Sequence, residues 1–240
     1  MSVVVAPLVL LGGFVLAPQV AGPCAPATTT TPATTTTPVA TTTPVATTTT
    51  TIVAASTTTT VALTCATGGS CAVGDTGPGG GIVFYVDLTR EPGAQYFEAA
   101  CAGWSDGTCG GDLTDPRATW GCSGTSITGA DGTAIGTGKQ NTTAIVNGCE
   151  TPDITPAERA YDLVLGGQSD WFLPSKDELN QMYINLHSAS TPLGGFSTDY
   201  YWSSSEFDDD FAWYQSFSYG YQTFNTKYST TAYVRPVRSF

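Results

Sequence analysis

The first 74 residues of this 240-residue chain contain no aspartate, glutamate, lysine or arginine. Basic residues are scarce throughout, with eight lysines and arginines against twenty acidic residues and a formal net charge of −12. All of this charge falls on the C-terminal part, which is long enough to form one domain with a sizeable core. Because so acidic a surface repels phosphate backbones, we expect no nucleic acid partner.

Short motifs of common enzyme and metal sites are also missing. The chain has one histidine, His187, and none of its seven cysteines is spaced as the CxxC pair of a zinc site. It contains no HExxH, and the glycines of residues 74–81 precede a strand-like run, which predicts a tight turn rather than a phosphate cradle. We therefore predict that the protein is not an enzyme and carries no metal and no cofactor. A glycan hydrolase with two carboxylates is left open, because acidic residues are plentiful.

Six of the seven cysteines lie in one glycine-rich part of the chain: Cys65, Cys71, Cys101, Cys109, Cys122 and Cys149. An even set in such a stretch is typical of a disulfide framework formed in an oxidising compartment. Six cysteines allow about fifteen pairings. The pairing predicted here joins nearest neighbours: Cys65–Cys71, Cys101–Cys109 and Cys122–Cys149.

Residues 3–20 form an apolar run of signal-peptide size, and small residues follow at 21–25. No lysine or arginine precedes the run, so either the true start lies upstream or cleavage is poor. Two prolines and a Gly-Gly pair argue against a stable membrane span. We predict a signal-peptide-like segment over residues 1–25 and a secreted or cell-surface protein. The membrane would be contacted only during export or through an uncleaved N-terminal segment.

Residues 26–64 are mostly threonine with proline, alanine and valine. Such a tract cannot bury enough apolar surface to offset the chain entropy lost on folding. Threonine-rich tracts with proline are typical of O-glycosylated stalks. We predict a disordered stalk here, followed by one folded domain over residues 65–240.

Two helices have clear start signals. Thr155 to Glu158 and Ser175 to Glu178 are capping boxes, predicting helices that run to about residue 165 and to His187. Residues 101–149 are predicted to be irregular apart from their disulfides. The predicted strands cover residues 82–87, 95–100, 200–204, 211–218, 221–228 and 233–237.

Five segments of the folded part carry a family resemblance: GDTGPGGGIVFYVD, WGCSGTSITGADGTAIGTGKQNT, SDWFLPSKDELNQMY, YYWSSSE and YVRPVRSF. In this order they resemble the C-terminal domain of bacterial collagen-like surface adhesins, a domain family of unknown function whose fold is similar to that of C-type lectins. The resemblance implies an α+β domain with two helices, antiparallel sheets and paired N- and C-terminal strands. The calcium-binding tripeptides of C-type lectins are absent, so calcium-dependent sugar binding of that kind is not expected.

These observations favour a surface binding module that recognises a glycan or a protein ligand. The alternatives are a structural or oligomerising head on the stalk, which implies a homo-oligomer, and the two-carboxylate hydrolase. Exposed aromatic rings would favour binding, whereas a wholly buried aromatic set would favour the structural role.

The candidate ligand site lies on the C-terminal hairpin. Alternation along residues 211–218 predicts that Phe211, Trp213 and Phe217 face the core and that Tyr214 faces outward. The predicted site therefore combines three tyrosines with three acceptors: Tyr214, Tyr219 and Tyr221 with Asp208, Asp209 and Asp210.

Three other conspicuous side chains are predicted to be structural. Trp202 is expected in the core, and His187 at a helix end, where a cation suits the helix dipole. Arg235 stands among apolar residues and therefore needs an acidic partner, for which Glu206 is a candidate.

Overall fold

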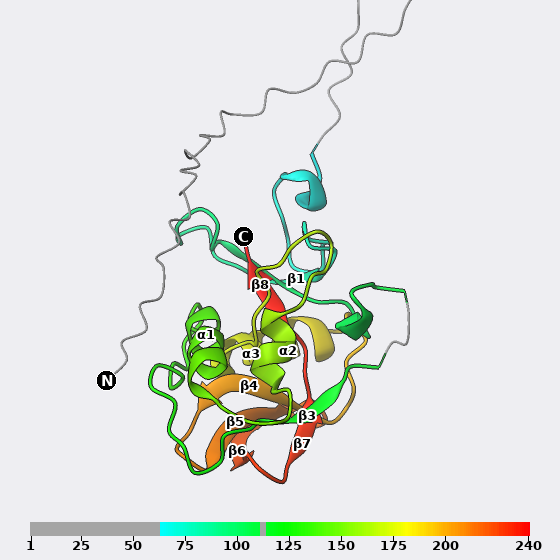
Figure 1. The fold of residues 1–240 in the computed structure, drawn as a ribbon. Coiled ribbons are helices and arrows are strands. Elements are labelled where there is room, and N and C mark those ends of the chain that lie inside the picture. The colour runs from blue at the N-terminus through cyan, green and yellow to red at the C-terminus, as the bar shows by residue number, and fades with distance from the viewer. Residues whose placement is uncertain (1–62, 111–113) are drawn as a thin grey trace, which may run out of the picture. The chain divides into compact units, whose positions relative to one another are not determined.

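The computed structural model describes residues 63–110 and 114–240 of the chain (Figure 1). The predicted signal-like segment and nearly all of the predicted stalk lie outside these residues. Within them the predicted α+β fold is confirmed, with three α-helices and two β-sheets. None of the helices in this part is long and apolar enough to cross a membrane.

Eight strands form the two sheets of the described part. The three-stranded sheet has the order β1-β2-β8, with β1 Ile82–Val86, β2 Tyr96–Ala99 and β8 Val237–Ser239. The five-stranded sheet has the order β3-β7-β4-β5-β6, with β3 Arg117–Thr119, β7 Thr231–Tyr233, β4 Tyr200–Glu206, β5 Phe211–Ser216 and β6 Gln222–Thr226. All pairs are antiparallel except β4 with β7. The resemblance implies paired N- and C-terminal strands; in the structure the C-terminal strand β8 pairs with β2, so it shares a sheet with the N-terminal strand β1 without pairing with it directly.

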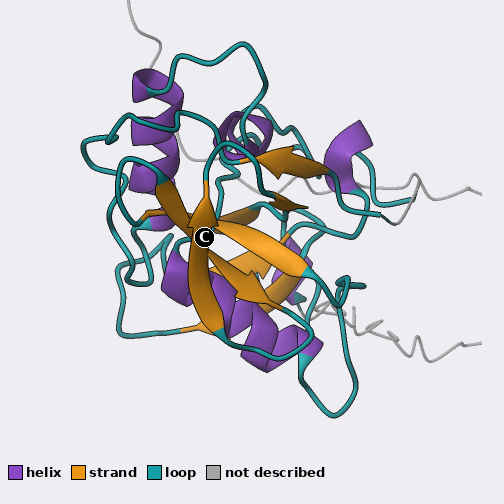
Figure 2. Ribbon diagram, turned by 90° about the horizontal axis from the view of Figure 1, so that it is seen from below, coloured by secondary structure: helices purple, strands orange, loops and turns teal. Residues whose placement is uncertain are grey.

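The helices are α1 Gly138–Gly148, α2 Pro156–Tyr161 and α3 Lys176–Met182, and a π-helical turn, Tyr183–His187, continues α3. In both predicted capping boxes the Thr155 or Ser175 side chain accepts the N–H of the glutamate three residues on. The first of these helices, α2, ends at Tyr161 rather than near residue 165. Helix α3 contacts strands of both sheets, and Figure 2 shows strands in the middle of the domain with helices around them.

Helix α1 is a correction to the prediction that residues 101–149 are irregular. Its sequence, GKQNTTAIVNG, is rich in residues of low helix propensity, and its N-terminus has no side-chain cap. Packing explains the helix, because Ile145 is buried in the core and Thr142 bonds the backbone of Leu173. Tertiary contacts therefore stabilise this helix in spite of the low helix propensity of its residues.

The predicted last strand over residues 233–237 is also corrected. The structure divides it into β7 and β8, which belong to different sheets. Pro236 lies between them and has no N–H to offer to a ladder. The chain therefore leaves the five-stranded sheet at Tyr233 and enters the three-stranded sheet at Val237.

Three disulfides join Cys65 to Cys71, Cys101 to Cys109, and Cys122 to Cys149. They confirm the disulfide framework and are the nearest-neighbour pairs. The third bond ties the loop after β3 to the C-terminal end of α1. It therefore restrains part of the strand-free stretch between β3 and β4.

The glycine-rich turn before β1 wraps a buried carboxylate. Glu98 in β2 accepts the backbone N–H groups of Gly79 and Gly81, each at 2.9 Å, and also pairs with Arg238 at 2.9 Å. A Cβ on Gly77 or Gly79 would lie within 3 Å of the Glu98 carboxylate. These glycines form the predicted turn before the strand and let its backbone approach the carboxylate closely.

Candidate functional site

The hairpin of β5 and β6 has two faces, and the strand register assigns each aromatic side chain to one of them. Tyr214 pairs with Thr223 on one face, and Trp213 pairs with Phe224 on the other. Because side chains alternate along a strand, Tyr221 shares the face of Tyr214. The two faces thus carry different aromatic sets.

Tyr219 and Tyr221 lie at the tip of this hairpin and are the exposed part of the predicted site. Tyr219 is 80% exposed and Tyr221 47%. Their rings are nearly parallel, at 15°, with centroids 6.3 Å apart. Two broad apolar surfaces of similar orientation therefore face solvent next to each other.

Tyr200 in β4 supports this pair, and the sequence reasoning missed it. Its hydroxyl forms a short hydrogen bond with that of Tyr221, which raises the pKa of Tyr200 to about 12. The Tyr200 ring also stacks on Tyr214 with centroids 4.4 Å apart. The hydroxyl therefore stays neutral at physiological pH, and the Tyr221 ring has a fixed neighbour. A signal was present in the sequence, since Tyr200 opens the predicted strand YYWSS.

Tyr214 is not available to a ligand in the way that the alternation predicted. It is buried, and its hydroxyl accepts a hydrogen bond from Asn225 at 2.8 Å. Trp213 and Phe211 are instead half-buried on the outer face. The assignment of faces was inverted at these positions, because both faces of β5 carry aromatic residues and hydrophobicity alone does not distinguish them.

Asp208, Asp209 and Asp210 lie in the turn before β5, at the opposite end of the strand from Tyr219. The six residues of β5 span roughly 20 Å at about 3.3 Å per residue. The structure therefore does not bring the three aspartates and the exposed tyrosines into one site.

The three aspartates have local roles in their turn. The Asp208 carboxylate accepts the N–H groups of Asp210 and Phe211, and Asp210 accepts the hydroxyl of Ser123 at 2.8 Å. The backbone carbonyl of Asp209 accepts a hydrogen bond from Lys227. Among the described residues no group of three or more His, Cys, Asp and Glu side chains could hold a metal ion.

A cavity of about 550 Å³ lies beside this turn, next to the Cys122–Cys149 disulfide. Glu150 and Asp153 line it together with Lys227 and Tyr228. Tyr228 is 79% exposed. The cavity thus brings two carboxylates and an exposed ring around one space.

Arg235 has the buried acidic partner that was expected, but the partner is Asp115 and not Glu206. The Arg235 Nε donates to Asp115 Oδ2 at 2.8 Å, and Tyr201 donates its hydroxyl to the same carboxylate at 2.9 Å. Burial raises the pKa of Asp115 above its ordinary value, although Arg235 opposes the shift. Glu206 pairs with Lys227 instead.

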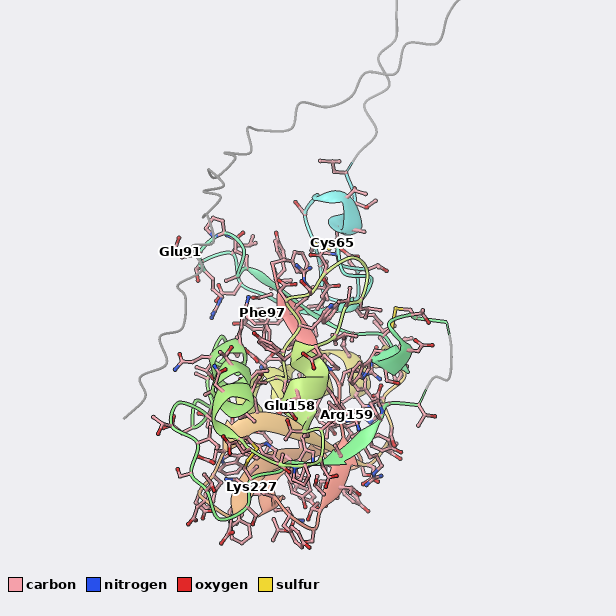
Figure 3. All side chains as sticks on the ribbon, viewed as in Figure 1. Cys65, Glu91, Phe97, Glu158, Arg159 and Lys227 are labelled. Carbon is pink, nitrogen blue, oxygen red and sulfur yellow. A yellow bond between two sulfur atoms is a disulfide. The ribbon has the colours of Figure 1, made fainter. Side chains whose placement is uncertain are left out.

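Basic residues are not gathered into one surface patch. Four of the eight are in ion pairs: Arg117 with Asp199, Lys227 with Glu206, Arg235 with Asp115, and Arg238 with Glu98 and Asp170. Figure 3 shows Lys227 and Arg159 in different parts of the domain. With a net charge of −12 and these bases already paired, long-range attraction of polyanions is weak.

The outer face of the hairpin carries a second aromatic set, which we call the Phe/Trp surface: Phe207, Phe211, Trp213 and Phe224. Phe207 and Phe224 stack at 4.0 Å with an angle of 10°, and Trp213 meets both rings edge-on. Phe207 is 45% exposed and Phe224 41%. Sequence reasoning missed this surface because it placed Phe211 and Trp213 in the core.

A family model described as Lcl C-terminal domain matches residues 104–238. The match covers 135 of the 240 residues and includes all three helices and the whole five-stranded sheet. No curated protein matches the chain.

Proposed function

The chain belongs to the Lcl C-terminal domain family, and from this premise we propose that it is an exported cell-surface protein whose folded domain binds a surface glycan. The observation that carries the proposal is the pair of exposed, nearly parallel rings of Tyr219 and Tyr221. Sugar rings stack their apolar C–H faces on such aromatic surfaces, while neighbouring hydroxyls orient them. The hydroxyls of Tyr200 and Tyr221 stand beside these rings and can both donate and accept hydrogen bonds.

Several features support binding rather than catalysis. All six cysteines of the described part are in disulfides, which leaves no thiol there for a cysteine-dependent reaction. His187 packs against the rings of Tyr183, Phe196 and Phe217 at the end of the π-helical turn. The exposed aromatic rings also favour a binding module over a purely structural or oligomerising head.

The test is a glycan array probed with the full chain and with two variants, each of which removes a strongly exposed tyrosine ring. Tyr219→Ala with Tyr221→Ala should lose binding, whereas Tyr228→Ala, which removes a ring of nearly the same exposure elsewhere, should keep it. Loss of binding only in the Tyr228 variant would move the site to the cavity lined by Glu150 and Asp153. An array on which the wild-type chain binds no glycan would overturn the proposal.

The hydrolase alternative has its own readout. Incubation of the chain with any bound glycan should leave the sugar intact. If the chain releases shorter sugars, and the double variant Glu150→Gln with Asp153→Asn does not, the domain is a hydrolase that acts at the cavity and not a binding module.

A further inference from the structure

We propose that the free edge of β6 is a docking site for an extended, basic peptide segment of a partner protein. Strand β6 is the last strand of the five-stranded sheet, and within the described ranges no other strand pairs with its outer side. An exposed edge of this kind offers unpaired backbone N–H and C=O groups to an incoming strand.

The register identifies which backbone groups point outward. Ser216 donates to the Tyr221 carbonyl at one end of the β5–β6 ladder, and Lys227 donates to the Asp210 carbonyl at the other. Bonded and non-bonded pairs alternate in an antiparallel ladder. Counting inward from both ends, Gln222 and Phe224 fall at non-bonded pairs with β5. Their N–H and C=O groups therefore face the open edge.

Strand β6 lacks three features that usually protect an edge, which are charge, proline and a bulge. Its sequence, QTFNT, has no lysine, no other charged residue and no proline. Its pairing with β5 runs without a bulge over all five residues. Natural edge strands are usually blunted by charge, proline or a bulge, so this unprotected edge is suited to pairing.

The Phe/Trp surface lies beside this edge and would receive the side chains of an added strand. Phe224 belongs to β6, and its ring packs against Phe207, Phe211 and Trp213. A strand added to β6 would direct alternate side chains onto the same face as Phe224. Backbone hydrogen bonds would provide affinity, and the stacked rings would select an apolar or β-branched side chain at those positions.

Charge decides which kind of strand fits. Asp209 and Asp210 are exposed and lie close to the Thr226 end of β6, because Asp210 bonds Lys227. One base, Lys176, lies at the Phe/Trp surface, with its ammonium 4.3 Å from the Trp213 ring centroid. A second copy of this chain would bring another net charge of −12 to the contact. Lysine or arginine flanking the apolar residues is the complementary pattern, so we infer a basic peptide.

The test uses a fluorescent peptide of about eight residues, long enough for one strand, with alternating lysine and valine. Binding to the full chain is measured by fluorescence anisotropy. Gln222→Pro removes one outward N–H without removing a bond to β5, and Gln222→Ala keeps that N–H and serves as the control. The proline variant should weaken binding at least about tenfold, while the alanine variant should stay within about twofold.

A second probe leaves the protein unchanged. The same peptide, N-methylated at alternate residues on its bonding edge, should bind as weakly as the proline variant does. Equal binding of the two Gln222 variants together with tight binding of the methylated peptide would overturn the proposal. Preference for a glutamate–valine peptide, or a wild-type dimer that Gln222→Pro dissolves, would also overturn it.

Discussion

The ammonium nitrogen of Lys227 lies 2.5 Å from Glu206 Oε1, and the two side chains are only 0% and 4% exposed. The Glu206 carboxylate also accepts the N–H of Ile127 at 2.9 Å. Lys227 donates to the backbone carbonyls of Thr125 and Asp209. This ion pair therefore joins the end of β4, the turn before β5, the loop after β3 and the segment after β6 at one buried point.

Removing one member of this pair should be strongly destabilising. Lys227→Met leaves the Glu206 carboxylate buried without its cation, which typically costs about 3–5 kcal/mol of unfolding free energy. Chemical denaturation of the variant and the wild type measures the difference. Lys227→Met combined with Glu206→Leu should recover part of the loss, since no charge is then left buried. A double variant as unstable as the sum of its single variants would show that the charges are not coupled.

Glu178 should make stability depend on pH. Burial raises its pKa to about 7, against an ordinary value of 4.5, although Ser175 and Gly136 donate N–H groups to it. The folded protein therefore holds the proton more tightly than the unfolded chain. This contribution is complete below about pH 4.5 and is lost as the pH rises through 7, amounting to about 3 kcal/mol. Unfolding curves of the wild type across this range should show the decline.

Glu178→Gln is the control for this pH dependence. Glutamine can replace glutamate in a capping box but does not titrate. The variant should show a flatter stability profile between pH 4.5 and 7. The same slope in both proteins would assign the dependence to another group, such as Asp115, whose pKa burial also raises.

In the glycine-rich turn, two adjacent glycines should differ in how well they tolerate replacement by alanine. A Cβ on Gly81 would lie 2.3 Å from the backbone carbonyl oxygen of Ala99, whereas a Cβ on Gly80 meets no atom within 4 Å. Gly81→Ala should therefore cost about 3 kcal/mol or more, because the backbone must move. Gly80→Ala should cost only about 1 kcal/mol, from its positive φ. Thermal unfolding of the two variants would rank them, and a reversed order would contradict the assignment.

The disulfides should differ in their contribution to stability. Cys122 and Cys149 are 27 residues apart, and Cys65 and Cys71 are 6 apart. From loop closure in the unfolded chain, removing Cys122–Cys149 should lower the free energy of unfolding by about 3–4 kcal/mol. Removing Cys65–Cys71 should lower it by about 2 kcal/mol. Replacement of each pair by alanine, followed by denaturation, tests the ranking. Equal losses would mean that native packing around the bonds outweighs loop length.

The sequence predicts those parts of the fold that depend on local chemistry. The capping boxes at Thr155 and Ser175 begin helices in the structure, and Gly220 lies in the turn between β5 and β6. These features need only a few neighbouring residues to specify them. Helix α1 was not predicted, because its stability comes from the burial of Ile145 in a core assembled from distant segments.

The candidate site could be predicted only in part, for a similar reason. Tyr219 and Tyr221 are exposed, as expected of turn residues, but Tyr214 is buried and Trp213 half-buried, the reverse of what alternation suggested. A strand with aromatic residues on both faces does not reveal which face the core will cover. The partner of Arg235 is 120 residues away in sequence, and no local pattern identifies Asp115.

Each cysteine of the described part is bonded to its immediate neighbour in the order of the chain. If the chain is exported with its N-terminus first, as proposed, Cys71 emerges when Cys65 is the only earlier cysteine of the described part, and each later pair emerges after the earlier pairs can have closed. Oxidation in order of emergence therefore yields the native connectivity directly, without the reshuffling of wrong bonds that interleaved pairings demand. Under the proposed export, the order of the cysteines would therefore let these three disulfides form correctly as the chain emerges.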